Sequence, residues 1–199
     1  MSTQSSLVLI TEASHDVAIA MAYAGPDNFT GQVIYDNDLC YLHAEAEAGL
    51  RKAIAAARGF GFQLKILDAF RPQEAQEALW AVAPNPAYIA NPAKGSNHTR
   101  GVAVDVTLIG PDGQVLDMGT PFDTMNKASH HFHAALPAQI QVNRAYLLTL
   151  MLEAGFVHHP NEWWHYQLPD ATKFPLIGWP QAHGSEAASS QHSGDLQTA

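Results

Sequence analysis

The chain has 199 residues, 47% hydrophobic and 15% charged, which is typical of one globular domain with a sizeable core. Its formal net charge of -9, without a run of Lys or Arg, argues against nucleic acid or an anionic membrane surface as a partner. The single cysteine, Cys40, excludes an internal disulfide and a thiolate zinc cluster. The apolar run at 7–10 is too short for an export signal or a membrane span, which predicts a cytoplasmic location.

The first predicted elements are two helices around a strand. Residues 41–58 are rich in Ala with apolar residues at helical spacing, and glycines follow directly. Residues 62–70 alternate between apolar and polar side chains, which predicts a strand. A helix is predicted over 72–83, because Pro72 suits a first turn and Pro84 stops the helix.

The second half repeats this mixture. A strand is predicted over 102–108, and the turn signal at 110–114 predicts that 114–119 returns as its hairpin partner. A helix is predicted over 141–153, before Gly155, and 156–170 has the pattern of two short strands around a Pro-Asn turn.

These elements predict an α+β fold with a largely antiparallel central sheet and flanking helices. One domain is expected over 1–180. Residues 181–199 are rich in Ala, Ser, Gln, Gly and His without an apolar pattern, which predicts a disordered tail.

The strand at 102–108 carries a carboxylate that needs a partner. Asp105 shares one face with Ala103 and Thr107, whereas the valines and Leu108 share the other face. Asp is depleted in strands, although an ordinary solvated Asp is the simpler explanation. His98 lies in the Gly/Ser/Asn loop just before this strand, where it can approach the polar face. Together they offer oxygen and nitrogen ligands suited to zinc.

A catalytic zinc needs three protein ligands, and "NEWWHY" at 161–166 offers the third. His165 fits as the ligand and Glu162 as the general base. A spacing of three residues puts both on one face of a helix but not of a flat strand, so the chain must turn near Glu162. The alternative is that Trp163, Trp164 and Tyr166 are core aromatics, and that Glu162 and His165 lie beside them without a catalytic role.

Other candidates are weaker. His130, His131 and His133 could bind a metal by their spacing, but no carboxylate base accompanies them, and a histidine-rich surface loop is the commoner explanation. The pair at 158–159 invites the same caution. The sequence has no G-x-S-x-G elbow, P-loop or G-x-G-x-x-G motif, which argues against serine hydrolase and nucleotide chemistry.

The ordered motif Ser96-x-His98-x-x-Gly101-x-Ala103-x-Asp105, followed by Glu162-x-x-His165, resembles the zinc D-alanyl-D-alanine dipeptidases of the VanX type. These belong with the D,D-carboxypeptidase and Hedgehog-like zinc peptidases. The resemblance covers about residues 15–170. It includes the further blocks "YAGPDNFTG" (23–31), "LDAFRP" (67–72), "DMGTPFD" (117–123), "SHH" (129–131) and "EWWHY" (162–166).

The resemblance implies one Zn²⁺ held by His98, Asp105 and His165. It also implies that zinc-bound water attacks the peptide carbonyl, with Glu162 as general base. Arg71 matches the arginine that stabilises the oxyanion. The positions that match the family's site for the free amino end of the dipeptide are Tyr23, Ser96 and Asp123.

The function predicted on this basis is zinc-dependent hydrolysis of D-Ala-D-Ala to two D-alanines. The first alternative is a D,D- or L,D-carboxypeptidase acting on peptidoglycan peptides. The second is a non-catalytic zinc-binding protein on the same scaffold, which the presence of both Glu162 and Arg71 disfavours. The segment 71–96 is shorter than in the vancomycin-resistance enzymes, which predicts a more open roof over the pocket.

Overall fold

A computed structural model of the chain describes residues 7–178. Its strands and α-helices, in chain order, are β1 (Leu7–Ile10), α1 (Glu12–His15), β2 (Ala18–Ile19), β3 (Cys40–His43), α2 (Ala44–Gly59), β4 (Gln63–Asp68), α3 (Gln73–Val82), β5 (Ala103–Ile109), α4 (Ala138–Glu153), β6 (Val157–His159) and β7 (Glu162–Gln167). Short 3₁₀ helices lie between or after them: η1 (Ala22–Ala24), η2 (Pro92–Lys94), η3 (Lys127–Ser129) and η4 (Ala171–Lys173).

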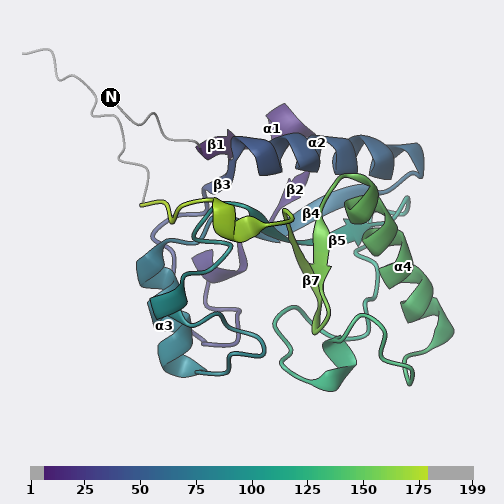
Figure 1. The fold of residues 1–199 in the computed structure, drawn as a ribbon. Coiled ribbons are helices and arrows are strands. Elements are labelled where there is room, and N and C mark those ends of the chain that lie inside the picture. Colours follow the sequence, from purple (N-terminus) through teal and green to yellow (C-terminus); the bar gives the residue numbers. More distant parts are fainter. Residues whose placement is uncertain (1–6, 179–199) are drawn as a thin grey trace, which may run out of the picture.

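The centre of the fold is a five-stranded sheet in the order β2-β4-β5-β7-β6. Only the β2–β4 pair is parallel, and the other three pairs of this sheet are antiparallel. A separate two-stranded antiparallel sheet joins β1 to β3. The prediction of an α+β fold around a largely antiparallel sheet is therefore confirmed (Figure 1).

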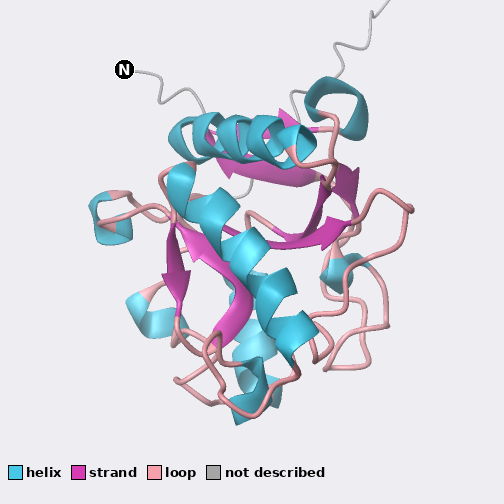
Figure 2. Ribbon diagram, turned by 90° about the vertical axis from the view of Figure 1, so that its right-hand side faces the viewer, coloured by secondary structure: helices cyan, strands magenta, loops and turns pink. Residues whose placement is uncertain are grey.

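Helices α2 and α4 cover the sheet and touch each other. Helix α2 contacts β4, and α4 contacts β6 and β7. In Figure 2, α4 runs across the front of the sheet and α2 lies above it, whereas Figure 1 shows α3 on the far side of the molecule from α4. The buried residues of α2 recur every three or four positions, which is the apolar stripe that a surface helix needs: Ala46, Gly49, Leu50, Ala53, Ile54 and Ala57.

The largest difference from the predicted elements is at 41–43. The helix predicted from residue 41 begins at Ala44, because Cys40–His43 pairs with Leu7–Ile10 as β3. The side chain of His43 then caps the helix, accepting a hydrogen bond from the backbone N–H of Glu45 at 3.2 Å. An apolar run fits both periodicities when it is this short, so only the distant partner strand decides the outcome.

The remaining predicted elements are close to those observed. Helix α4 starts three residues earlier than predicted, and the turn after β5 is present with Gly110 N–H donating to the Gln114 carbonyl at 2.8 Å. The returning segment makes only one bridge, Ile109 to Val115, rather than a full hairpin strand. Both faces of β5 are buried, so Asp105 lies in a covered interior and not on an open polar surface.

The predicted tail at 181–199 and the domain boundary at 180 lie outside the described residues, and the single-domain assignment stays a prediction. Within 7–178, none of the helices combines the length and apolar character needed to cross a membrane. The cytoplasmic location stays a prediction.

Candidate metal centre and active site

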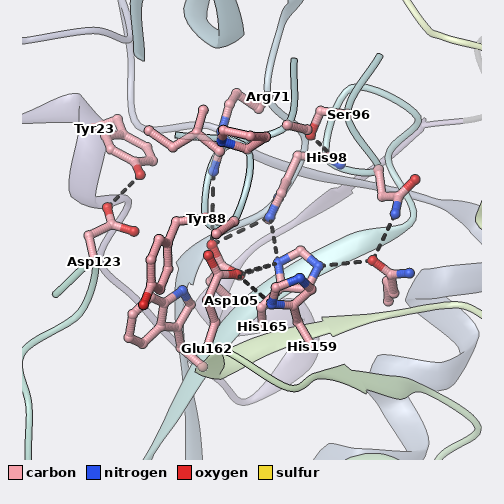
Figure 3. Close-up of a pocket in the computed structure, with 17 residues that line it drawn as sticks. Tyr23, Arg71, Tyr88, Ser96, His98, Asp105, Asp123, His159, Glu162 and His165 are labelled. Carbon is pink, nitrogen blue, oxygen red and sulfur yellow. Dashed lines mark hydrogen bonds and ion pairs between the residues drawn. The ribbon is translucent and has the colours of Figure 1, made fainter. Parts of the chain in front are cut away.

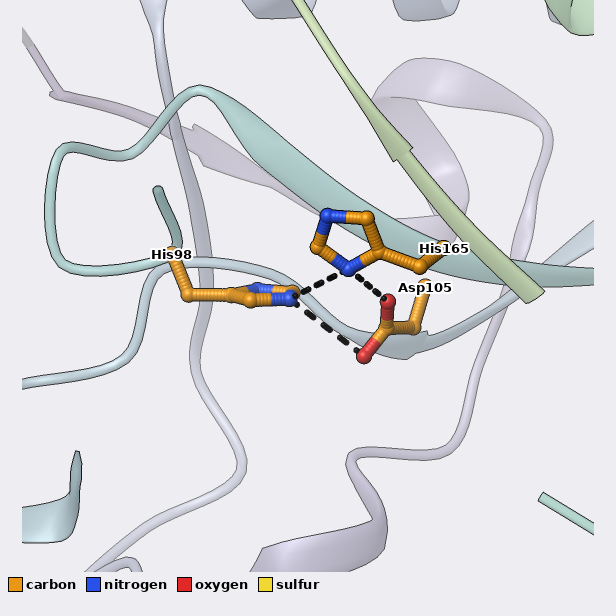
Figure 4. A group of neighbouring side chains, drawn as sticks. All are labelled: His98, Asp105 and His165. Atoms are coloured by element: carbon orange, nitrogen blue, oxygen red, sulfur yellow. Dashed lines mark hydrogen bonds and ion pairs between the residues drawn. The ribbon is translucent and has the colours of Figure 1, made fainter. Parts of the chain in front are cut away.

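Three side chains from two strands and a loop meet in the interior (Figure 4). His165 Nδ1 lies 3.0 Å from Asp105 Oδ1, and His98 Nε2 lies 3.4 Å from Asp105 Oδ2. The two imidazole nitrogens are 3.2 Å apart. All three residues are buried, with exposed fractions of 2% to 8%. Two imidazoles and a carboxylate thus point single donor atoms at one point.

The sheet register explains two of these positions. Asp105 of β5 and His165 of β7 are directly paired across the antiparallel ladder, so their side chains emerge side by side on one face. His98 comes from the loop that leads into β5. That loop turns at Gly101, whose φ of +69° favours glycine, and the Gly101 carbonyl accepts the backbone N–H of His43 at 2.8 Å.

A hydrogen bond fixes which nitrogen His98 presents. Its Nδ1 lies 2.7 Å from the Ala69 backbone carbonyl, an acceptor, so Nδ1 carries a proton and Nε2 is the nitrogen that faces the other two side chains. The pKa of Asp105 reflects the same neighbours. Burial alone would raise it, but His98 and His165 hold the pKa well below its usual range, so the carboxylate is ionised.

The donor set fits a zinc ion. Tetrahedral ligands about 2.1 Å from a common zinc lie about 3.4 Å from one another, close to the separations observed here. The three donor atoms fall within 4.8 Å of each other, and within 7–178 no other group of three or more His, Cys, Asp or Glu is arranged in this way. Three protein ligands leave a fourth position open, as catalytic zinc sites require.

Glu162 lies beside this centre at the start of β7. Its Oε2 is 3.8 Å from His165 Nδ1 (Figure 3). In place of the predicted turn near Glu162, the pairing of β6 with β7 is irregular, and its register shifts between His158 and His159. This irregularity lets Glu162 and His165, three residues apart, lie on the same side of the strand. The pKa of Glu162 is raised to about 8: burial raises it most, His165 lowers it, and Asp105 contributes to the rise.

Arg71 approaches the centre from just after β4, and two side chains hold its guanidinium through three hydrogen bonds. Its Nη2 and Nε donate to Asp68 Oδ2 at 2.6 and 3.0 Å, and its Nη1 donates to Gln76 Oε1 at 2.9 Å. Asp68 accepts a further hydrogen bond from the Tyr35 hydroxyl at 2.6 Å. Arg71 Nη2 is 4.0 Å from Asp105 Oδ2, which leaves the guanidinium beside the ligand cluster with little freedom to move.

The other predicted substrate residues line the same pocket. Tyr23 of η1 donates its hydroxyl proton to Asp123 Oδ2 at 2.5 Å, and the guanidinium of Arg71 lies 5.1 Å from the centre of the Tyr23 ring. Loss of solvation raises the pKa of Asp123 to about 7, although the hydrogen bond from Tyr23 opposes this. Ser96 is buried and accepts the His98 backbone N–H at 3.2 Å. The structure therefore brings all eight predicted site residues around one pocket.

The pocket has a volume of about 170 Å³, and residues 86–90 of the segment 71–96 contribute to its lining. Tyr88 is one of them, with its hydroxyl 3.1 Å from His130 Nε2. These residues are held at two more points: Asn161 Nδ2 donates to the Ala87 carbonyl at 3.2 Å, and Gln76 Nε2 donates to the Ala90 carbonyl at 2.7 Å. The segment 71–96 thus lines part of the pocket, and the more open roof predicted from its length stays a prediction.

The sequence also left Asp68, Gln76, Asn97, His159 and Gln167 unassigned. One signal existed: Asp68 precedes Arg71 by three residues in "LDAFRP". His159 lines the pocket with Nδ1 3.7 Å from Glu162 Oε2. Burial lowers the pKa of His159 to about 4, so it is neutral near pH 7.

Comparison with known proteins agrees with this geometry. A family profile described as D-Ala-D-Ala dipeptidase, of the M15 peptidases, matches residues 3–186. The chain belongs to this family. It is 44% identical over 177 residues to the D-alanyl-D-alanine dipeptidase of Escherichia coli K12, covering 89% of this chain and 92% of that one.

Two further members of the dipeptidase family come from enterococci. The D-alanyl-D-alanine dipeptidase of Enterococcus faecium is 34% identical, over 81% of this chain and 90% of its own. That of Enterococcus faecalis V583 is 30% identical, over 84% and 93%. Among solved structures, the Zn(II) complex of a mutant of the vancomycin-resistance D,D-pentapeptidase VanY aligns with a TM-score of 0.43 and 20% identity, over 70% of this chain and 80% of that chain.

Proposed function

We propose that this chain hydrolyses D-Ala-D-Ala to two D-alanines, with one Zn²⁺ held by His98, Asp105 and His165. The observation that carries the proposal is the composition of one small pocket. It combines three metal-ligating side chains with a buried carboxylate, a fixed guanidinium and a second carboxylate. The relatives named as D-alanyl-D-alanine dipeptidases support the choice of substrate.

Glu162 moves the proton in this reaction. Zinc at the three ligands would supply a Lewis acid for the carbonyl. Its positive charge would lower the pKa of a nearby water to about 7 and would favour the ionised form of Glu162. Hydrolysis adds one water across the peptide bond. Glu162 takes a proton from the attacking water as the C–O bond forms, and delivers it to the departing amine as the C–N bond breaks.

Arg71 stabilises the charge that develops on the carbonyl oxygen. The Asp68 and Gln76 contacts hold its guanidinium before substrate arrives, so little reorganisation is needed during the reaction. Its proton donors that are not used by Asp68 or Gln76 remain available for the pocket. The neighbouring Asp105 at 4.0 Å places these donors next to the metal centre.

Asp123 and Tyr23 select the free amino end of the substrate. An ammonium group placed at Asp123 gains a charged hydrogen bond, while Ser96 and Tyr23 add polar contacts. A blocked amino end leaves the Asp123 carboxylate without a cationic partner in a poorly solvated site, with only the Tyr23 hydroxyl bonded to it, which costs binding energy. The pocket volume of about 170 Å³ favours a small substrate as well.

The test is steady-state kinetics of the zinc-loaded protein on D-Ala-D-Ala, L-Ala-L-Ala, N-acetyl-D-Ala-D-Ala and a muramyl pentapeptide. We expect the highest kcat/KM for D-Ala-D-Ala by a wide margin. Preferential release of D-alanine from the pentapeptide would replace the dipeptidase with the carboxypeptidase alternative. Zinc binding without hydrolysis of any of the four would leave the non-catalytic alternative.

A further inference from the structure

A pair of amide side chains lies directly behind the metal centre. Asn97 Nδ2 donates to Gln167 Oε1 at 2.7 Å, and the same oxygen lies 3.0 Å from His165 Nε2. Asn97 adjoins His98 in the loop, and Gln167 is the last residue of β7. The pair therefore ties the loop that carries one metal ligand to the strand that carries another.

The sheet gives Gln167 this position. His165 and Gln167 are two residues apart on β7, so their side chains share a face. Across the ladder, His165 is paired with Asp105 and Gln167 with Ala103. The small Ala103 side chain leaves room beside it for the two amides, whereas Asp105 occupies the corresponding space beside His165.

A bound metal would require Gln167 to present its oxygen, not its nitrogen, to His165. His165 directs Nδ1 at His98 and Asp105, so Nδ1 must be a lone pair when a metal is bound and Nε2 must carry the proton. A protonated Nε2 needs an acceptor, and Gln167 Oε1 is placed to be one. That oxygen has two lone pairs, one for His165 and one for Asn97.

We propose that Gln167, oriented by Asn97, is a positioning residue that fixes the ring and the tautomer of His165 for metal binding. The inference rests on the zinc centre of the proposed function. The other imidazole relies on the Ala69 backbone carbonyl, which no side-chain substitution removes. His165 relies on a side chain, so its positioning can be altered without touching a ligand.

The experiment measures zinc affinity of stripped protein by competition with a chelator. Gln167→Leu removes the acceptor at similar volume, and we expect about 10- to 100-fold weaker zinc binding. Gln167→Glu keeps an acceptor oxygen, and we expect affinity at least equal to wild type. Asn97→Ala removes only the donor that orients Gln167, so its loss is expected to be smaller. The visible spectrum of the Co²⁺-loaded Leu variant should also differ from wild type.

Gln139→Leu is the matched control, because Gln139 Nε2 donates to Asn143 Oδ1 at 2.9 Å on α4, away from the ligands, and its zinc affinity should equal wild type. Melting of each metal-free variant reports folding separately. Wild-type affinity in the Gln167→Leu variant would overturn the proposal. A Gln167→Glu variant as weak as the Leu variant would also overturn it, since side-chain shape alone would then be responsible. Zinc binding without dipeptide hydrolysis contradicts the proposed function only.

Discussion

Two histidine-bearing regions of this molecule differ in what surrounds the imidazoles. At the metal centre, His98 and His165 face the ionised Asp105, and each has a hydrogen-bond acceptor behind its other nitrogen. In the 129–131 segment, His131 Nε2 contacts the Tyr166 hydroxyl at 3.3 Å, and its ring lies 5.0 Å from that of His158. Both regions contain several histidines, but among the described residues only at the metal centre does a carboxylate, that of Asp105, contact them.

Burial and the nearby Arg144 oppose a cation bound at His131. The pKa of His131 is lowered to about 3, mainly by burial and also by the nearby His158, Arg144 and His159. The segment is held by Arg144, which donates to the backbone carbonyls of Met118, Ala128 and His130 at 2.7–2.8 Å. The 129–131 segment is therefore a structural support, and a carboxylate with tautomer-fixing acceptors is what distinguishes a metal centre from a histidine cluster.

Replacing one histidine in each region tests most directly whether the two regions have different roles. In His98→Ala we expect zinc to be lost on dialysis and hydrolysis of D-Ala-D-Ala to fall below detection, because two protein ligands remain. In His131→Phe we expect full zinc content and a decrease in stability of about 1 kcal/mol, from the lost contact to Tyr166. Elemental analysis and thermal melting measure both. Zinc loss in His131→Phe would contradict the division of roles.

Glu162→Gln separates metal binding from proton transfer within the first region. We expect kcat to fall by about 10²- to 10⁴-fold, because the amide cannot accept the proton of water. Zinc content should stay at wild-type level, since Glu162 is not a ligand. A kcat close to wild type would remove Glu162 from the mechanism.

Asp123→Asn tests the substrate end of the pocket. The backbone of Asp123 has φ = 58°, which Asn tolerates, so folding should be kept. We expect kcat/KM for D-Ala-D-Ala to fall by about 10- to 150-fold, since a hydrogen bond to a charged group contributes about 1.5–3 kcal/mol. Activity on N-acetyl-D-Ala-D-Ala, already low, should change little. An equal loss on both substrates would mean that Asp123 does not recognise the ammonium.

The same substitution has a smaller effect on stability that depends on pH. The pKa of Asp123 is raised from 3.8 to about 7 in the folded protein. Between these values the folded state binds more protons than the unfolded state, so this group lowers stability as pH rises. Metal-free Asp123→Asn should melt like wild type below about pH 4 and at a higher temperature than wild type above about pH 7. A lower melting temperature than wild type at alkaline pH would contradict the assignment.

The sequence predicts the metal centre better than the shell that holds it. The spacing of His98 and Asp105, with Glu162 and His165 downstream, indicates the ligand types, and the family resemblance assigns their roles. Asp68 accepts hydrogen bonds from Arg71, and Gln167 contacts the His165 nitrogen that faces away from the other two metal ligands. The β5–β7 register and the path of the chain after β4 create these contacts, and residue spacing alone predicts neither the register nor that path.

The fold follows the same division. Long periodic segments such as α2 and β5 are predictable from local pattern, whereas β1 and β2 have four and two residues and depend on distant partners. Residues 41–43 show the limit most clearly, because their strand exists only through pairing with 7–9. Local sequence determines elements that bury a face over several turns, and tertiary pairing determines the rest.

In the proposed function, one zinc ion at His98, Asp105 and His165 makes this protein a D-Ala-D-Ala dipeptidase. Titration of zinc into stripped protein, with D-alanine release from D-Ala-D-Ala measured at each addition, tests it most directly. We predict that the rate rises linearly to one zinc per chain and then stays constant. Hydrolysis by the stripped protein, or no hydrolysis once one zinc per chain is bound, would contradict the claim.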